Sequence, residues 1–252
     1  MSAAASRGAA AALFTLLVFA LWQVAVDSGL VSRVFVAAPL SAFEVMIERA
    51  ANGSLWTTTG ATALRLFAGW VAAVAIAMMI GTAIGNFRAA YEYLAPTLEF
   101  FRPLPASAVI PVAVLFLGLT AKMSTAVIAF GALWPVLLSA MHGFANVPRE
   151  LREVAATLEM SRARYILTVA IPSASVDIMA GLRISLSLAL ILTVVTEMQA
   201  SLPGIGYEIF AAQRTFRSAD LYAGLMTLGI FGFLINQALL LSERRLMRWR
   251  AA

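Results

Sequence analysis

Residues 66–85 read LFAGWVAAVAIAMMIGTAIG and carry no ionisable side chain. A helix needs about 20 apolar residues to cross the hydrocarbon core of a bilayer. The segment is one continuous apolar run and does not alternate apolar with polar residues, so it predicts a membrane-spanning helix and not a barrel strand. Gly81 and Gly85 form a GxxxG pair within it, and such small residues let neighbouring helices approach closely.

The composition indicates that most of the chain lies in a membrane. Of the 252 residues, 62% are hydrophobic and 12% are charged, whereas a typical soluble domain is about 25% charged. There is no cysteine, which excludes a disulfide framework and a thiolate metal site. The net charge of +5 would suit nucleic acid, but the basic residues separate the apolar blocks and do not cluster in one soluble domain. We therefore predict no nucleic-acid partner.

Six apolar blocks predict an all-α polytopic membrane protein with six transmembrane helices, in a single domain that covers residues 1–252. The predicted spans are residues 10–26, 66–85, 103–121, 123–143, 180–198 and 221–242. The first block follows a short N-terminus with Arg7, as in a signal peptide, but no small-residue cleavage site follows it, so we interpret it as a span. The third and fourth blocks are separated only by a tight turn around Lys122.

Prolines distinguish the third block from the others. Pro103, Pro105 and Pro111 each disturb the hydrogen bonds of a helix. Within a membrane such breaks are tolerated where protein or a water-filled cavity covers the backbone. The third span is therefore the predicted pore-lining helix.

The distribution of Lys and Arg predicts that both termini are cytoplasmic. With the N-terminus inside, the inner segments carry ten of these residues and the outer segments carry six. Four of the ten directly follow the last span, namely Arg244, Arg245, Arg248 and Arg250. The loop over residues 146–179 is then cytoplasmic as well.

This loop contains a short helix with an apolar stripe. Pro148 suits the first turn of a helix, and the positions i, i+3, i+4 and i+7 are then apolar: Leu151, Val154, Ala155 and Leu158. A second short helix is predicted from Ser161 until Pro172 stops it. The membrane interface, a groove on a partner protein or the chain's own spans would each cover these apolar faces, and the spacing leaves the three open.

Several blocks of the sequence, taken in order, resemble the permease subunits of bacterial ABC importers. Glu153-Val-Ala155 is followed by Ile171-Pro172 and then by GLRISLSLALI at 181–191, which is similar to the "EAA" loop of that family. The other matching blocks are AAPLSAFEVM at 37–46, TALRLFAGWVAAVAIAMMIGTAIGN at 62–86, EFFRPLPASAVIPVAVLFLGL at 99–119 and TEMQASLPGIGYEI at 196–209. Within that superfamily they look most like the nitrate/sulfonate/taurine branch.

The resemblance implies a type I ABC importer permease in the bacterial inner membrane, which forms the path of a small anionic solute by alternating access. It also implies partners: cytoplasmic ABC ATPase subunits that bind ATP and Mg²⁺, a periplasmic or lipid-anchored solute-binding protein, a second permease copy in a homodimer, and the surrounding membrane lipid. The loop over residues 146–179 would be a coupling helix that docks in a cleft of the ATPase. Its implied coupling residues are Glu153, Val154, Ala155, Leu158, Glu159, Ser161 and Pro172.

Glu159 departs from the family pattern, because the family usually has glycine at this bend. A positive φ costs a residue other than glycine about 1 kcal/mol. The bend is therefore expected to be more helical than in the family, or strained, or accepted by the ATPase in a different shape.

Four residues are predicted to line the solute path, namely Arg102, Pro105, Glu197 and Gln199. Two of them have alternative roles. Glu197 either lines the path or its outer gate, or it marks the water interface or pairs with an outer arginine. Arg102 either attracts an anionic solute or pairs locally with Glu99.

We predict no catalytic residue, cofactor or metal site in this chain. It lacks the GxxxxGK[ST] loop that cradles phosphates. The sole histidine, His142, is interpreted as structural or interfacial, because metal sites need several ligands together. The alternative function is an ion-coupled secondary transporter or channel, which would call for charged relays inside several spans and an inverted repeat. Neither is visible in the sequence.

Overall fold

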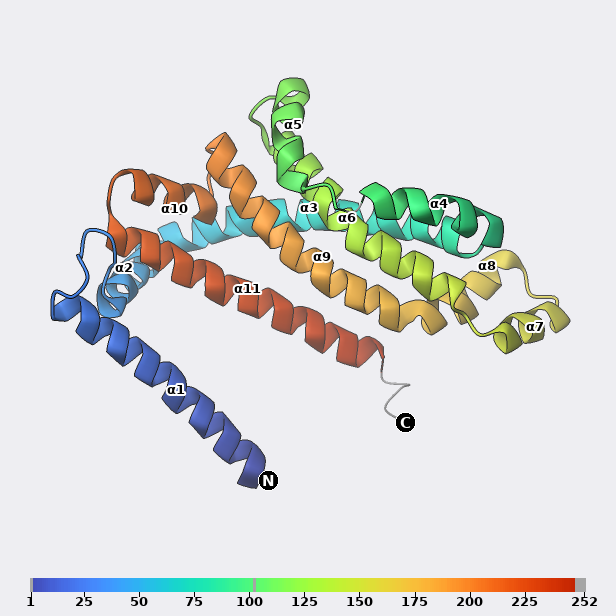
Figure 1. The fold of residues 1–252 in the computed structure, drawn as a ribbon, viewed down its shortest axis with the longest axis horizontal. Coiled ribbons are helices and arrows are strands. Elements are labelled where there is room, and N and C mark those ends of the chain that lie inside the picture. Colours follow the sequence, from blue (N-terminus) through green and yellow to red (C-terminus); the bar gives the residue numbers. More distant parts are fainter. Residues whose placement is uncertain (1, 102, 248–252) are drawn as a thin grey trace. The chain divides into compact units, whose positions relative to one another are not determined.

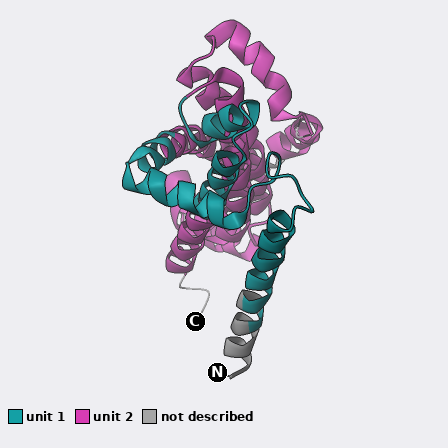
Figure 2. Ribbon diagram, turned by 90° about the vertical axis from the view of Figure 1, so that its left-hand side faces the viewer, with its two compact units in different colours: residues 1–61, 203–231 teal, residues 62–202, 232–252 magenta. Residues whose placement is uncertain are grey.

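The computed structural model describes residues 2–101 and 103–247, and within them all regular structure is helical (Figure 1). The chain divides into two compact units (Figure 2). One consists of residues 1–61 and 203–231, and the other of residues 62–202 and 232–252. Two long helices, α3 (Ser54–Gly85) and α11 (Ser218–Leu246), contribute residues to both units.

The first unit also contains α1 (Ser2–Asp27), α2 (Pro39–Ala51) and α10 (Ile205–Arg214). Arg49 of α2 joins these elements, because its guanidinium forms ion pairs with Glu208 of α10 and, at 2.5 Å, with Asp220 in the first turn of α11. Ser218 Oγ donates a hydrogen bond of 2.7 Å to the carbonyl oxygen of Arg33. These contacts tie the segment before α2 to the start of α11.

The second unit is built around α6 (Ala121–Ala145) and α9 (Ile171–Ala200). Glycines allow the two helices to approach closely: a Cβ atom on Gly181 would lie 2.7 Å from the carbonyl oxygen of Pro135. The predicted GxxxG pair has the same role against α6. A Cβ atom on Gly81 or Gly85 would lie 2.7 Å from the Cβ atom of Ala140 or Phe144, respectively, so the predicted close approach is confirmed.

Four of the six predicted spans lie in helices that are long and apolar enough to cross a membrane, which confirms an all-helical membrane protein. These helical segments are Ser54–Gly85, Ala121–Ala145, Arg162–Ala200 and Ser218–Leu246. The first predicted span lies in α1, whose described apolar part, Leu13–Asp27, is shorter. That span stays a prediction.

The third predicted span, residues 103–121, is interrupted near its prolines, as they predicted, and is not one straight helix; that it crosses the membrane stays a prediction. The chain instead forms α4 (Arg88–Phe101), a 3-10 turn η1 (Ala106–Val109) and a short α5 (Ile110–Leu117). The two halves of this region, Ala89–Phe101 and Ala106–Leu117, are bent by 79°. Pro105 contributes to the bend, because proline disfavours the helical conformation in the residue before it, here Leu104. Pro105 itself has an extended backbone, with φ −67° and ψ 116°.

The turn between α5 and α6 lies before Lys122 and not around it. Gly118 ends α5 with a φ of +65°, a conformation that glycine adopts without a steric penalty. Thr120 then caps α6, because its hydroxyl accepts a hydrogen bond of 3.3 Å from the backbone N–H of Met123. Lys122 therefore belongs to the first turn of α6.

The prediction that Pro172 ends the second helix of the loop is wrong. Pro172 lies at the start of α9. The chain is helical without a break from Arg162 to Ala200, through α8 (Arg162–Tyr165), a π-helical segment η2 (Ile166–Ala170) and α9. Proline removes one backbone hydrogen bond and its ring crowds the carbonyl four residues earlier. The wider π turn directly before Pro172 supplies the space, a common way for a helix to absorb such a mismatch.

Candidate functional site

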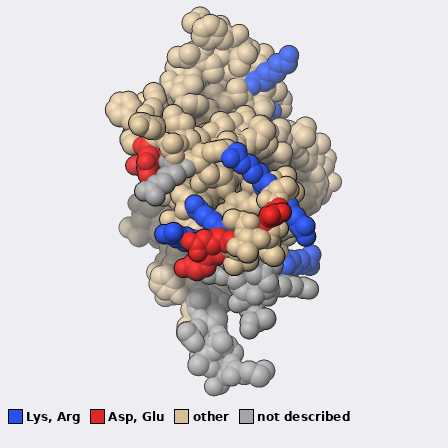
Figure 3. Space-filling view, turned by 90° about the vertical axis from the view of Figure 1, so that its right-hand side faces the viewer, with Lys and Arg blue, Asp and Glu red and all other residues tan. Residues whose placement is uncertain are grey.

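Most of the predicted coupling residues lie in α7 (Arg149–Thr157) or directly after it, and charged side chains lie on the face of the molecule that Figure 3 shows. Glu153 accepts a hydrogen bond of 2.8 Å from Arg149 Nε on the same exposed face. Of the apolar stripe, only Ala155 is buried. Leu151, Val154 and Leu158 are 42%, 54% and 68% exposed. The stripe therefore forms an apolar surface that the described chain does not cover.

Arg152 fastens α7 to the end of α6. Its Nη2 atom donates hydrogen bonds to the carbonyl oxygens of Phe144, at 3.0 Å, and Ala145, at 2.8 Å. The last carbonyls of a helix have no partner within it, and a basic side chain near a helix C-terminus also suits the helix dipole. These hydrogen bonds hold α7 against the C-terminal end of α6.

Glu159 adopts the strained form of the bend. Its φ is +49°, and two hydrogen bonds close a Schellman motif around it: Glu159 N–H donates to Ala156 and Met160 N–H donates to Ala155, each at 3.0 Å. Glycine is the usual residue at this position of the motif. Among the three expectations for this bend, the more helical form is excluded, and the backbone follows the turn that glycine would favour.

Replacing Glu159 with glycine is expected to stabilise the protein by about 1 kcal/mol, because glycine adopts positive φ without the Cβ clash. The apparent melting temperature in detergent should rise by about 2–4 °C. Glu150→Gly is the matched control, since Glu150 is an exposed residue of α7 with helical backbone and glycine there should cost about 1 kcal/mol. If Glu159→Gly and Glu150→Gly lower the melting temperature equally, the backbone of Glu159 is not strained.

Ser161 and Pro172 position the helix that follows the bend. Ser161 caps α8, because its hydroxyl accepts a hydrogen bond of 3.4 Å from the N–H of Arg164. Pro172 is half-buried in the first turn of α9. Both residues therefore act on the continuous helix from Arg162 to Ala200, and neither lies on the exposed stripe of α7.

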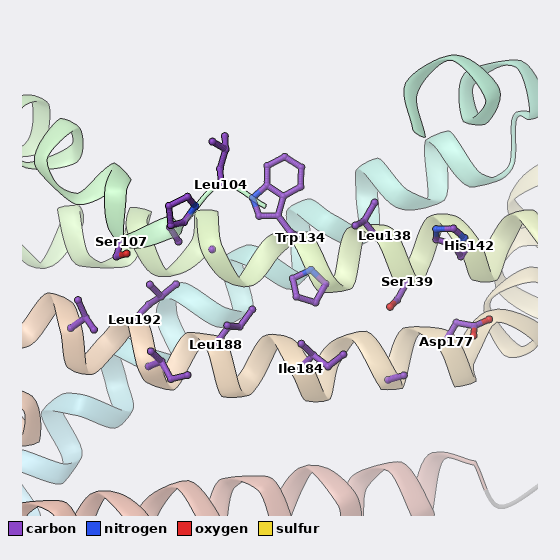
Figure 4. A pocket seen from close by; sticks show the side chains of 17 residues that line it. Leu104, Ser107, Trp134, Leu138, Ser139, His142, Asp177, Ile184, Leu188 and Leu192 are labelled. Carbon is purple, nitrogen blue, oxygen red and sulfur yellow. The ribbon is translucent and has the colours of Figure 1, made fainter. Parts of the chain in front are cut away.

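A cavity of about 640 Å³ lies between the segment around η1 and the helices α6 and α9 of the second unit. Along α9 its wall is apolar, with Ile184, Leu188 and Leu192 directed toward it (Figure 4). Its polar side chains are Ser107, Trp134, Ser139, His142 and Asp177. The cavity is thus mostly apolar with a few groups that hydrogen-bond, as in many small-molecule sites.

Two polar groups of the cavity have informative surroundings. The indole N–H of Trp134 is buried and has no hydrogen-bond partner among the described residues. His142 lies with its Nδ1 atom 3.2 Å from Tyr91 Oη and its Nε2 atom 3.7 Å from Glu99 Oε1. The histidine thus connects α4 to the end of the cavity that it shares with Asp177.

Of the four residues predicted to line the solute path, Pro105 contributes to this cavity. Arg102 lies outside the described residues, so its pairing with Glu99 stays untested. Gln199 is exposed and does not line the cavity. Glu197 is fully buried and pairs with Arg65 of α3, and it also accepts a hydrogen bond of 3.2 Å from Thr62 Oγ1. Of the roles considered for Glu197, the structure shows the pairing with an arginine.

Sequence reasoning missed the cavity residues of α6 and α9, although a signal was present. On α6 they recur at helical spacing around Pro135, as Trp134, Leu138 and His142. On α9 they recur every three or four residues from Asp177 to Val195. That periodicity marks one face of each helix, but it does not show which neighbour the face meets.

The sequence of this chain is similar to those of known transport proteins. The family described as "Binding-protein-dependent transport system inner membrane component" matches residues 73–249. A Bacillus subtilis (strain 168) permease protein whose name refers to aliphatic sulfonates transport is 30% identical over 238 residues, which is 94% of this chain and 86% of the relative. The taurine transport system permease protein of Escherichia coli (strain K12) is 28% identical over 233 residues, 90% of this chain and 85% of that protein.

A solved structure, titled as an inward-facing conformation of the MetNI methionine ABC transporter, is similar in fold. The TM-score is 0.62, with 17% sequence identity, and the match covers 76% of this chain and 95% of that chain. At this identity the likeness concerns the fold alone.

Proposed function

Because the chain belongs to the family of binding-protein-dependent transport system inner membrane components, we propose that it is the permease subunit of an ATP-driven importer and couples to a separate ATPase through α7. Family membership makes it a multi-pass inner-membrane transport subunit and not an enzyme. We propose in addition where this subunit couples to the ATPase, along which path the solute crosses, and which partners it has.

The exposed stripe of α7 carries this proposal. Leu151, Val154 and Leu158 present apolar side chains on a helix that is otherwise charged. A groove on a soluble partner protein would bury them, and each fully buried leucine or valine side chain contributes roughly 1.5–3 kcal/mol to the binding free energy. Arg152 and the Schellman turn fix the stripe against α6 and α8. A push on α7 therefore reaches the two helices that line the cavity.

The cavity between α6 and α9 is the proposed solute path. Ser107 and Ser139 offer hydroxyl donors to a sulfonate or nitrate oxygen, and the relatives in Bacillus subtilis and Escherichia coli are named for aliphatic sulfonates and taurine. We propose a small anionic cargo of this kind, delivered by a solute-binding protein. A second copy of the chain would complete the wall, and both termini and α7 would face the cytoplasm.

The coupling proposal is tested by replacing both Val154 and Leu158 with serine. Loss of two exposed apolar contacts should weaken binding of the cognate ATPase by at least roughly 30-fold, taking about 2 kcal/mol as a lower bound for the pair. Co-purification of the ATPase and ATP-dependent solute uptake into proteoliposomes are the measurements. The melting temperature of the free subunit should not change, because both side chains are exposed.

Leu64→Ser is the control for a general loss of apolar surface, since Leu64 is 75% exposed on α3, away from the loop. It should leave ATPase binding intact. Uptake that continues without any ATPase and follows a sodium or proton gradient would instead favour an ion-coupled secondary transporter.

A further inference from the structure

A second groove lies where α3 ends, beside α8 and η2, and shares no residue with the cavity between α6 and α9. Its volume is about 660 Å³, within the roughly 300–1,000 Å³ typical of ligand sites. Met78, Met79, Ile166 and Ile171 give it an apolar floor. A smaller hollow of about 240 Å³ adjoins it, because both are lined by Asn86, Arg162 and Tyr165.

The groove changes from apolar to polar along α3. The candidate span of α3 ends at Gly85, so Met78 and Met79 lie within its apolar run, whereas Asn86 and Phe87 follow the span. Arg162 and Tyr165 lie on the polar side of the groove. Tyrosine is enriched at the boundary between membrane and water, where its ring is apolar and its hydroxyl is hydrated.

Arg162 is available to a ligand at this polar end. Its side chain is exposed and lies over the ring of Phe87, with the guanidinium carbon 5.1 Å from the ring centroid. Among the residues that the structure describes, it forms no ion pair. Arginine is well suited to phosphate, because its planar guanidinium donates two parallel hydrogen bonds.

We propose that this groove binds an anionic phospholipid, with an acyl chain along Met78 and Met79 and the phosphate at Arg162. Basic pockets between membrane helices are known to hold anionic headgroups. A soluble ATPase is the competing occupant, since α7 is near in sequence. To contact Met78 and Met79 it would have to reach into the candidate span of α3, whereas a lipid fills the apolar and polar parts together. The proposal requires only that α3 spans the membrane, so it stands apart from the coupling function.

The test is native mass spectrometry of the purified full-length protein, with any co-purifying subunits, in neutral detergent. Phosphatidylglycerol and phosphatidylcholine with identical acyl chains are added in turn. The wild type should retain phosphatidylglycerol in preference, and Arg162→Gln should reduce this retention about tenfold, which corresponds to one charge-assisted hydrogen-bonding group. Met79→Asp should reduce retention of the same lipid, because it places a charge on the acyl-chain floor.

Arg164→Gln is the matched control. Arg164 is also an exposed arginine, two positions away, and it does not line the groove. Equal losses in the two arginine variants, or equal retention of both lipids by the wild type, would overturn the site. Displacement of phosphatidylglycerol by inorganic phosphate would show that the groove binds free anions and not lipid. Loss of the ATPase from Arg162→Gln, with lipid retention unchanged, would assign the groove to the ATPase.

Discussion

Replacing Glu197 with glutamine should lower the free energy of unfolding by about 3–5 kcal/mol, the range for removing one partner of a buried ion pair. Glu197 is fully buried in α9 and the side chain of Arg65 in α3 is only 10% exposed. Glutamine preserves the shape and can still accept a hydrogen bond from Thr62. The guanidinium of Arg65 loses the carboxylate that balances its charge, and in a membrane protein water cannot readily replace it.

The measurement is the apparent melting temperature of the purified protein in detergent, together with the fraction that elutes as a single species. Arg65→Met combined with Glu197→Leu is the decisive comparison, because replacing both partners of a buried pair with apolar groups is often neutral. The double variant should recover most of the stability that either single variant loses. If the stability lost in the double variant equals the sum of the losses in the two single variants, the ion pair is not what stabilises this contact.

Replacing Gly181 with alanine should be the next most costly change, with a loss of about 1–3 kcal/mol. The new methyl group would lie 2.7 Å from the carbonyl oxygen of Pro135 and 2.7 Å from the Cβ atom of Ser139. A backbone carbonyl cannot rotate away as a side chain can, so α6 and α9 must separate. Because these helices form the cavity walls, the separation should lower solute uptake as well as stability.

Gly60→Ala is the control for this prediction. Gly60 also lies within a helix, but no atom lies within 4 Å of the position of its Cβ. Alanine there should stabilise α3 by up to about 1 kcal/mol through helix propensity alone. A melting temperature for Gly181→Ala at or above that of Gly60→Ala would show that the close approach of α6 and α9 is not needed.

Local features of the sequence predicted what depends on local physics. The uncharged run of residues 66–85 predicted most of α3, and the spacing of Leu151, Val154 and Leu158 predicted α7 with its apolar stripe. The family resemblance was likewise visible in short blocks. In each case one segment carries its own signal, whatever it later packs against.

Features that depend on distant contacts were not predictable in the same way. The partner of Glu197 is 132 positions away in the chain, and no spacing rule joins them. The cavity needs one face of α6 and one face of α9, and only packing decides that these faces meet. At Pro172 the rule that proline ends a helix was outweighed by the π turn of η2, which depends on how the neighbouring turns of the same helix adjust.

The unbroken helix from Arg162 to Ala200 has a mechanical consequence. Its 39 residues, at about 1.5 Å each, make a rod of about 58 Å. Tilting such a rod by about 5° shifts one end by about 5 Å relative to the other, from the same rise per residue. If the tight contact at Gly181 serves as the pivot, the two ends move in opposite directions. A small rotation that begins next to α7 would then move the parts of the cavity wall before and after Gly181 in opposite directions.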